Sequence, residues 1–375
     1  MEMTREKLLR AYPEMPKSTA LRLEHTLEKL QSGAYEKSAQ GAPKRIGFVM
    51  ALAIVLLAAW GWRQKAQPAA AYYANKGTVF GTYYNIQYQS EADLHDSILA
   101  AFDAFDRSLS MFNRASVISR INHNQDTLTD AFFEQMWAEA ARVHALSGGA
   151  FDITVAPLVN LWGFGFKHRE QVTAAKIDSL LPLVGFEKVA LREHRVWKAD
   201  ERIMLDASAV AKGQACDVIG ALLARNGAEN YLVDIGGEVV AKGLSKHGEP
   251  WRIGITKPVD DPTGESKALQ DIIQTSDICM ATSGNYRNFY YEGGERRSHT
   301  IDPRTGYPVQ HSLLSATVVA SSCMRADALA TACMVLGADA AKQMLEQAGD
   351  AAGYFIIAQG DSTVVVTTTD WSFHR

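Results

Sequence analysis

The sequence has few cysteines and no excess of positive charge, and both shortages narrow the class of protein. Its four cysteines form no CxxC pair and show no zinc-ligand spacing, and they are too sparse for a disulfide scaffold. Its 38 Lys and Arg residues are outnumbered by 42 Asp and Glu residues, which argues against nucleic-acid binding, because that function needs a basic surface. We find no internal repeat. The remaining composition, 47% hydrophobic and 21% charged, is typical of a globular protein.

One long apolar run departs from globular composition. Residues 46–62 (IGFVMALAIVLLAAWGW) carry no charge and have basic residues on both sides. A bilayer core requires about 17 or more apolar residues, so we predict a single transmembrane signal anchor. A buried core helix is one alternative, although such a helix rarely lacks a polar face. A cleaved signal peptide ending near residues 69–71 is another, but residues 1–45 would be far too long a basic region for it.

The anchor divides the chain into four predicted parts: a cytoplasmic N-terminal arm at residues 1–45, the anchor at 46–62, a linker at 63–75 and a folded domain at 76–375. The arm carries nine Lys and Arg residues, and few basic residues follow the anchor closely. Positive charge near a membrane segment favours the cytoplasmic side, so we expect the folded domain on the exported side. The arm could hold a docking helix for an unknown cytoplasmic partner.

The folded domain mixes strand and helix patterns in separate runs. Thr78–Tyr88 is rich in β-branched and aromatic residues and predicts a strand. Ala92–Leu109 and Asp130–Leu146 have apolar residues at helical spacing. Residues 354–359 and 363–369, joined through Gly-Asp-Ser, predict a hairpin. Because strands and helices do not alternate strictly, we predict an α+β fold with mixed or antiparallel sheets and flanking helices.

Leu205–Gly213 (LDASAVAKG) leads into an apolar helical pattern and is a candidate anion site. A helix N-terminus presents free N–H groups and the positive end of a dipole, which suits a phosphate, and Lys212 would lie near it. Alternatively, Asp206 and Ser208 only cap the helix, and Lys212 is solvated. The pattern alone leaves both interpretations open.

Met324–Gly337 predicts a second helix, ended by its glycine. Asp327 and Thr331 are four residues apart, so both side chains project from one face. Carboxylate and hydroxyl oxygens are hard ligands that suit Mg²⁺ rather than zinc. The alternative is an ordinary Asp–Thr pair on a helix surface.

The segment RSHTIDPRTGYP predicts a tight turn at residues 302–306, with His299 and Ile301 extended just before it. A rigid turn is a usual place for a catalytic side chain, although a lone histidine is more often structural. Residues 234–237 (DIGG) predict a strand end that another backbone approaches closely. Residues 283–287 (SGNYR) could bring an arginine to a phosphate or simply form a loop.

Together and in this order, these segments resemble the ApbE family, the FAD:protein FMN transferases. The resemblance covers roughly Lys76 to the C-terminus and excludes the anchor and the arm. The matching segments are GTVFGT, SMFNRASVISRIN, GGAFDITVAPLVNLWGFG, LDASAVAKG, VDIGGEV, TSGNYR, SHTIDPRTGYPV and RADALATACMVLG. The resemblance implies an ApbE-like, T-fold-related domain.

The resemblance also implies which residues form the site. Positions that match those binding FAD, the substrate, are Phe80, Ala150, Phe151, Asp152, Asp206, Lys212 and Ile301. Positions that match the Mg²⁺ ligands are the Ala209 carbonyl and the side chains of Asp327 and Thr331, and His299 matches a histidine with a base or positioning role. Two positions depart from some relatives: Ala330 replaces a further metal-ligating Asp, and Asn285 replaces an Asp.

The implied reaction is Mg²⁺-dependent transfer of the FMN moiety of FAD to a Thr or Ser hydroxyl of a partner flavoprotein, with release of AMP. The partner would be an exported or membrane redox protein with a Thr/Ser flavinylation motif, and no such motif occurs in this chain. The implied location is a bacterial inner membrane, with the catalytic domain on the periplasmic side. Two alternatives remain: an Mg²⁺-dependent FAD pyrophosphatase that gives FMN and AMP, and a non-catalytic flavin-binding protein. The presence of Lys212, Asp327 and Thr331 argues against a non-catalytic protein.

Overall fold

The computed structural model describes residues 71–165, 171–258, 268–285, 289–292, 295–360 and 362–372. The predicted N-terminal arm at 1–45 and the predicted anchor at 46–62 lie outside these residues, as does most of the linker. No helix within the described ranges is both long enough and apolar enough to cross a membrane.

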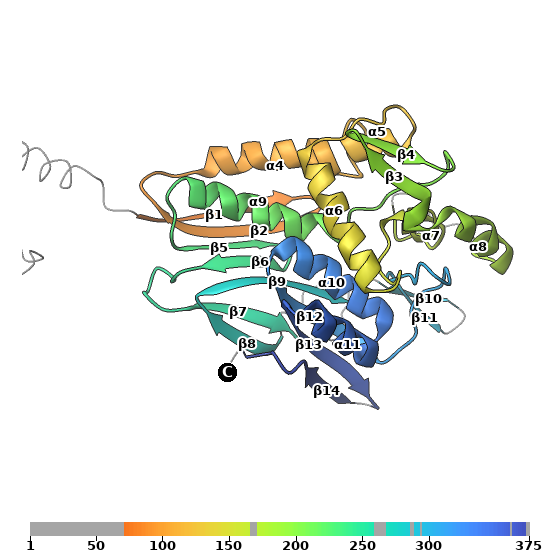
Figure 1. The fold of residues 1–375 in the computed structure, drawn as a ribbon. Coiled ribbons are helices and arrows are strands. Elements are labelled where there is room, and N and C mark those ends of the chain that lie inside the picture. The colour runs from red at the N-terminus through yellow and green to blue at the C-terminus, as the bar shows by residue number, and fades with distance from the viewer. Residues whose placement is uncertain are drawn as a thin grey trace, which may run out of the picture. The chain divides into compact units, whose positions relative to one another are not determined.

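An antiparallel sheet of eight strands forms the centre of the folded part (Figure 1). All neighbouring strands pair antiparallel, which confirms the α+β prediction and identifies its sheet as antiparallel. In spatial order the strands are β1 (Ala71–Val79), β2 (Thr82–Ser90), β5 (Tyr231–Ile235), β6 (Glu238–Lys242), β9 (Asp277–Gly284), β12 (Leu313–Ala320), β13 (Ala351–Gln359) and β14 (Ser362–Thr367).

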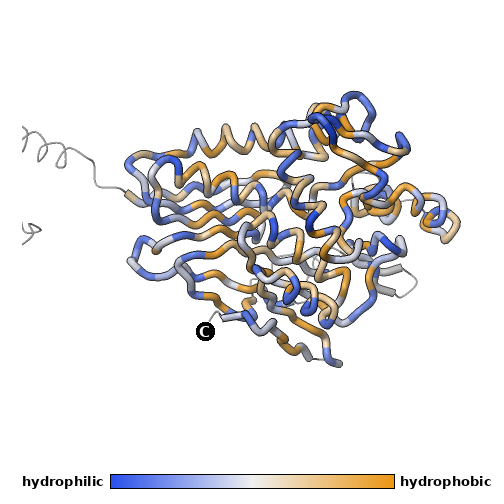
Figure 2. Tube along the Cα trace, viewed as in Figure 1, coloured by the Kyte–Doolittle hydropathy of each residue, from blue (hydrophilic) through white to orange (hydrophobic). Residues whose placement is uncertain are grey.

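Helices cover one face of this sheet in two layers (Figure 1). The inner layer is α9 (Ala211–Arg225), α10 (Cys323–Leu336) and α11 (Ala338–Ala348), which contact β5, β6, β9, β12 and β13. The outer layer is α4 (His95–Leu109) and α6 (Ala131–Leu146), which pack on α9 and α10. The main core lies between the sheet and these helices, where side chains such as Ile86, Val233, Phe102, Ile219 and Leu329 are buried. Hydrophilic residues gather in the peripheral loops (Figure 2).

A hairpin packs on the opposite face of the sheet. Its strands are β7 (Trp251–Thr256) and β8 (Leu269–Thr275). Ile253 and Ile273 from the hairpin and Leu232 and Met280 from the sheet belong to a second buried cluster. The smaller elements are α5 (Val117–Asn122), α7 (Ala156–Leu161), α8 (Ala174–Leu180), the hairpin of β3 (Val189–Arg192) and β4 (Arg195–Lys198), the hairpin of β10 (Phe289–Glu292) and β11 (Glu295–Ser298), and the 3-10 helices η2 (Ile153–Val155), η3 (Leu181–Leu183) and η4 (Phe186–Lys188).

The structure confirms the two helices predicted from apolar spacing and the hairpin near the C-terminus. The strand predicted at Thr78–Tyr88 is confirmed at residues 78–79 and 82–88, but a turn that the prediction missed interrupts it. That segment is a hairpin in which Val79 pairs with Thr82, so Phe80 and Gly81 form the turn. Both turn residues have left-handed φ angles, 51° and 75°, as a two-residue hairpin turn of the primed type requires. Residues 71–75, which we assigned to the linker, are part of β1.

Candidate active site

A cavity of about 1000 Å³ opens where the sheet meets the start of α9 and the middle of α10. The structure brings every predicted site residue to its lining, although these residues are widely separated in the sequence. They are Phe80, Ala150, Phe151, Asp152, Asp206, Ala209, Lys212, His299, Ile301, Asp327 and Thr331. Their shared location makes one site, while the role of each residue stays a prediction.

Aromatic side chains form one wall of the cavity. The Phe80 ring packs against Phe102 and Phe105 of α4, with ring centroids 5.6 and 5.5 Å apart. Phe80 has a positive φ angle, a strained backbone conformation for a phenylalanine, so the surrounding packing must stabilise it. The strained turn therefore presents Phe80 to the cavity, together with Phe105, Met111 and Phe151.

Phe112 also lines the cavity and is 81% exposed. Its loop is held by hydrogen bonds: Ser116 Oγ donates to the Ser110 carbonyl at 2.7 Å, and Asn113 Nδ2 donates to Asp106 Oδ2 at 2.7 Å. A large apolar ring held in solvent beside a cavity is suited to stacking on a flat ligand.

The segment after α6 turns through Gly148 and Gly149, both with positive φ, and then buries Phe151 and Asp152. The carboxylate of Asp152 is already bound by the protein. Its Oδ1 accepts hydrogen bonds from the backbone N–H and the hydroxyl of Thr154, at 2.8 and 2.6 Å, and its Oδ2 accepts one from Phe186 N–H at 2.9 Å. Asp152 therefore anchors this segment through its side chain, which leaves its backbone for a ligand.

The segment before α9 differs from the predicted capping arrangement. The helix begins at Ala211 after Val210, and no side chain caps it, so the alternative in which Asp206 and Ser208 cap the helix is wrong. Instead, Asp206 accepts hydrogen bonds from the N–H and hydroxyl of Ser208 in a turn just before the helix. Burial raises the pKa of Asp206, and its bonds to Ser208 oppose that shift.

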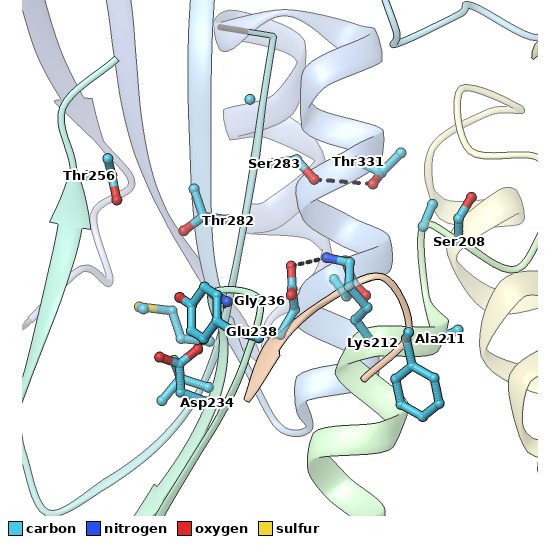
Figure 3. A pocket seen from close by; sticks show the side chains of 18 of the residues that line it. Ser208, Ala211, Lys212, Asp234, Gly236, Glu238, Thr256, Thr282, Ser283 and Thr331 are labelled. Carbon is cyan, nitrogen blue, oxygen red and sulfur yellow. Dashed lines mark hydrogen bonds and ion pairs between the residues drawn. The ribbon is translucent and has the colours of Figure 1, made fainter. Parts of the chain in front are cut away.

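Lys212 forms an ion pair with Glu238, which rules out the alternative of a solvated lysine. Its Nζ lies 2.5 Å from Glu238 Oε1. Figure 3 shows Lys212 of α9 and Glu238 of β6 pointing toward one another. Glu238 is only 2% exposed, and burial raises its pKa to about 7 while the charge of Lys212 opposes the shift. Burial acts to lower the pKa of Lys212, but the charges of Glu238 and Asp327 outweigh it and the pKa is raised.

Asp327 is 3% exposed, so the alternative of an Asp–Thr pair on a helix surface is also wrong. Its Oδ2 accepts a hydrogen bond from Gly213 N–H at 3.0 Å, so α10 supplies a partner for an N–H in the first turn of α9. Asp217 of α9 in turn accepts hydrogen bonds from Cys323 N–H and Met324 N–H of α10, at 2.9 and 2.8 Å. The two helices that carry Lys212 and Asp327 are thus bound to each other through backbone N–H groups at the N-terminus of each.

A set of oxygens near Asp327 fits a hard cation. Asp327 Oδ1 receives no hydrogen bond from the described residues, and one turn along α10 Thr331 Oγ1 lies 3.2 Å from Ser283 Oγ of β9 (Figure 3). Glu238, Asp327 and Lys212 together carry one excess negative charge if all are ionised. In the described part of the chain no three His, Cys, Asp or Glu side chains gather as a metal cluster. An ion here would need hydroxyl, carbonyl and water ligands as well, which is compatible with Mg²⁺.

His299 and Ile301 precede the predicted tight turn, which the structure confirms: the Gly306 N–H donates to the Asp302 carbonyl at 2.8 Å, and Ile301 pairs with Pro308. The His299 ring meets Phe164 edge-on at 6.3 Å. Asn285 Oδ1 accepts a hydrogen bond from the Thr300 hydroxyl at 2.6 Å, so Asn285 tethers the segment that carries His299 and Ile301. The arginine proposed for a phosphate, at 287, lies outside the described residues.

Sequence reasoning missed Glu238, Ser283 and Phe112 as cavity residues. Glu238 follows Gly236 and Gly237, which have positive φ and turn the chain from β5 into β6. The close approach expected at this turn is real, but the neighbour of Gly236 is the Thr82 side chain rather than a backbone. The sequence signal for Glu238 was a glutamate at the start of an apolar strand, directly after a Gly-Gly turn. A charged residue buried at such a position needs a partner.

Comparison with known proteins agrees with the geometry. The sequence model of the ApbE family matches residues 80–355. The FAD:protein FMN transferase of Haemophilus influenzae is 36% identical over 310 residues, which cover 78% of this chain and 88% of that protein. That of Vibrio cholerae is 39% identical over 272 residues, covering 70% and 80%. The solved structure of the flavin transferase ApbE from Vibrio cholerae covers 81% of this chain and 100% of its own, with 34% identity and a TM-score of 0.74. The chain therefore belongs to the ApbE family, and it is a transferase.

Proposed function

We propose that this protein transfers the FMN moiety of FAD to a Thr or Ser hydroxyl of a partner flavoprotein, through a phosphoester bond and with release of AMP. The observation that carries the proposal is the cavity itself. Its lining combines aromatic side chains with a half-buried ammonium, two buried carboxylates and two hydroxyls. FAD combines the same two kinds of chemistry, because its flat ring systems are joined by a charged pyrophosphate.

The reaction needs positioning and charge neutralisation more than covalent help. The acceptor hydroxyl attacks the FMN-side phosphorus, a new O–P bond forms, and the P–O bond to AMP breaks. The ammonium of Lys212 has three donors and gives one to Glu238, so others are available to phosphate oxygens. Phe80 and Phe151 would contact a ring system, and His299 would position the reacting groups or take the hydroxyl proton.

Magnesium would be held by the Asp327 and Thr331 side chains and the Ala209 carbonyl, with water completing its shell. Bound there, Mg²⁺ supplies a Lewis acid for the phosphate oxygens. The chain's own contribution is to fix its ligands. Asp327 is bound by Gly213 N–H from α9, and Thr331 faces Ser283 from β9.

We also propose that residues 46–62 anchor the chain in a bacterial inner membrane, with the transferase domain on the exported side and its acceptor among exported or membrane redox proteins. Reporter fusions after residue 40 and at the C-terminus test this orientation. A C-terminal reporter that is active only in the cytoplasm would contradict it.

The activity is tested by incubating the full-length protein with FAD, Mg²⁺ and candidate acceptor domains from exported redox proteins. Flavin fluorescence that stays with the acceptor on a denaturing gel, together with AMP release, is the expected result. A chelator control should stop both. AMP release without labelling of any acceptor would instead support the pyrophosphatase alternative, in which water replaces the protein hydroxyl.

A further inference from the structure

One oxygen of Glu238 has no hydrogen-bond partner. Its Oε1 binds Lys212, but its Oε2 is buried and receives no hydrogen bond within the described residues. Glu238 is 2% exposed, and it lines the cavity. A buried acceptor left without a donor is destabilising, and more so when it is charged. An atom of this kind points to a ligand group that supplies the missing donor.

The other carboxylates that line the cavity in the described region are in a different state. Asp206 accepts hydrogen bonds from Ser208. Asp327 Oδ1 also receives no hydrogen bond from the described part of the chain, but it is assigned to the proposed magnesium ion and is not one of the fully buried oxygens that lack a donor. Asp152 is bound by Thr154 and Phe186, as described above. Asp234 accepts a hydrogen bond from Gly237 N–H at 3.0 Å. Glu249 is exposed to solvent. Among these carboxylates only Glu238 has a buried oxygen that lacks a donor.

The chemistry of the proposed substrates indicates which group can donate a hydrogen bond to Glu238 Oε2. Ionised phosphate groups of FAD carry no hydrogen to donate, and their negative charge repels a carboxylate. They can instead bind the remaining donors of Lys212, which lies 2.5 Å from the other Glu238 oxygen. Glu238 Oε2 would then lie beside the phosphate that is attacked, where the attacking group is an O–H.

We infer that Glu238 Oε2 is the binding point for the attacking hydroxyl: it accepts a hydrogen bond from the Ser or Thr side chain of the acceptor. The inference rests on the proposed function and names a part of its site. As the hydroxyl oxygen bonds to the FMN-side phosphorus, its proton passes along this hydrogen bond, and the electron pair of the broken P–O bond leaves with AMP. His299 then has a positioning role.

The test compares Glu238→Gln with Glu346→Gln in the full-length protein. Glutamine at 238 keeps a carbonyl oxygen for Lys212 but replaces the second acceptor with an NH₂ group. Glutamine at 346 removes the same charge at an exposed position of α11, outside the cavity lining. The probe is an exported redox-protein domain that the wild-type protein labels with flavin, and labelling is measured at saturating FAD. FAD affinity is titrated separately by flavin fluorescence without acceptor.

We expect Glu238→Gln to bind FAD within about threefold of wild type and to label the acceptor about 10- to 100-fold more slowly, the range for losing one hydrogen bond to a charged group. Glu346→Gln should label at the wild-type rate. Wild-type labelling by Glu238→Gln would overturn the inference. Equal losses of FAD affinity and labelling would also overturn it, because Glu238 would then act only through Lys212.

Failure of the proposed function gives a different result. If the wild-type protein releases AMP but labels no acceptor, the transferase proposal fails while FAD cleavage remains measurable. The hydroxyl is then that of water, and the same pair of variants is compared by AMP release. A selective loss in Glu238→Gln would keep Glu238 as the hydroxyl-binding residue, and an unchanged rate would reject it.

Discussion

Replacing Gly213 with alanine should push apart the two helices that carry the charged groups of the cavity. A Cβ at this position would overlap the Cys323 carbonyl oxygen and lie 2.8 Å from Asp327 Cβ. The first contact is with backbone, which cannot rotate away. Overpacking of this kind costs about 1–3 kcal/mol, while alanine recovers about 0.5–1 kcal/mol of helix propensity. The variant should therefore lose up to about 2.5 kcal/mol of unfolding free energy.

Gly220 provides a matched control in the same helix. A Cβ there would lie 3.3 Å from Val240 Cγ1 and 3.5 Å from Tyr231 Cε2, which are side-chain atoms able to shift slightly. Gly220→Ala should therefore be neutral or gain a few tenths of a kcal/mol from helix propensity. The two variants carry the same chemical change in one helix, so the difference between them isolates the contact between α9 and α10.

The assay is urea unfolding followed by tryptophan fluorescence, with AMP release measured over a magnesium titration. Gly213→Ala should unfold at lower urea than Gly220→Ala. It should also need more magnesium, because separation of the helices weakens the hydrogen bond from the residue 213 N–H to Asp327. If Gly213→Ala is as stable as Gly220→Ala and has the wild-type magnesium response, the close packing of the two helices does not organise the site.

Three further outcomes follow from the same structure. Asp327→Asn keeps an acceptor for the neighbouring backbone N–H but loses the charge, so circular dichroism should show a folded protein while AMP release at ordinary magnesium is lost; a wild-type rate would reject the metal site. Phe112→Ala should weaken FAD binding about tenfold in a fluorescence titration without changing stability, since the side chain is 81% exposed. Trp197→Ala is the control, because Trp197 is 60% exposed and lies outside the cavity lining. It should change neither FAD affinity nor stability. Burial raises the pKa of Asp217 to about 6, so the folded protein binds more protons than the unfolded chain between about pH 4 and pH 6. This contribution to the unfolding free energy is full below about pH 4 and is lost as pH rises through about 6. Urea titrations across this range should show a weaker decline in Asp217→Asn, and equal slopes would contradict the assignment.

Patterns that depend on local spacing predicted the fold well. Apolar positions three and four apart and the capping side chain of Asp130 place α6 within one residue of its predicted start. The glycine at 337 ends α10 as expected. The cavity residues were assembled from a resemblance of ordered motifs, and the structure brings them to one place.

The errors arise where tertiary contacts decide. Aromatic and β-branched residues around Phe80 have high strand propensity, but packing on α4 stabilises a turn that few phenylalanines adopt. Asp327 has a surface-like sequence context, and its burial depends on α9, which precedes it by several strands. Glu238 was missed because its pairing with Lys212 depends on the tertiary structure. The sequence alone does not show that β6 lies beside α9.

The hydrogen bond between Gly213 N–H and Asp327 joins α9 to α10, two helices that are synthesised at different times. The Phe80 turn is synthesised early, Lys212 and Glu238 later, and α10 only near the end of the chain. Contacts between such distant segments form late, because a long loop must close before they contribute any stability. A nascent or truncated chain without α10 has neither Asp327 nor Thr331. If Asp327 and Thr331 hold magnesium as proposed, this capacity arises only when synthesis of the chain is nearly complete.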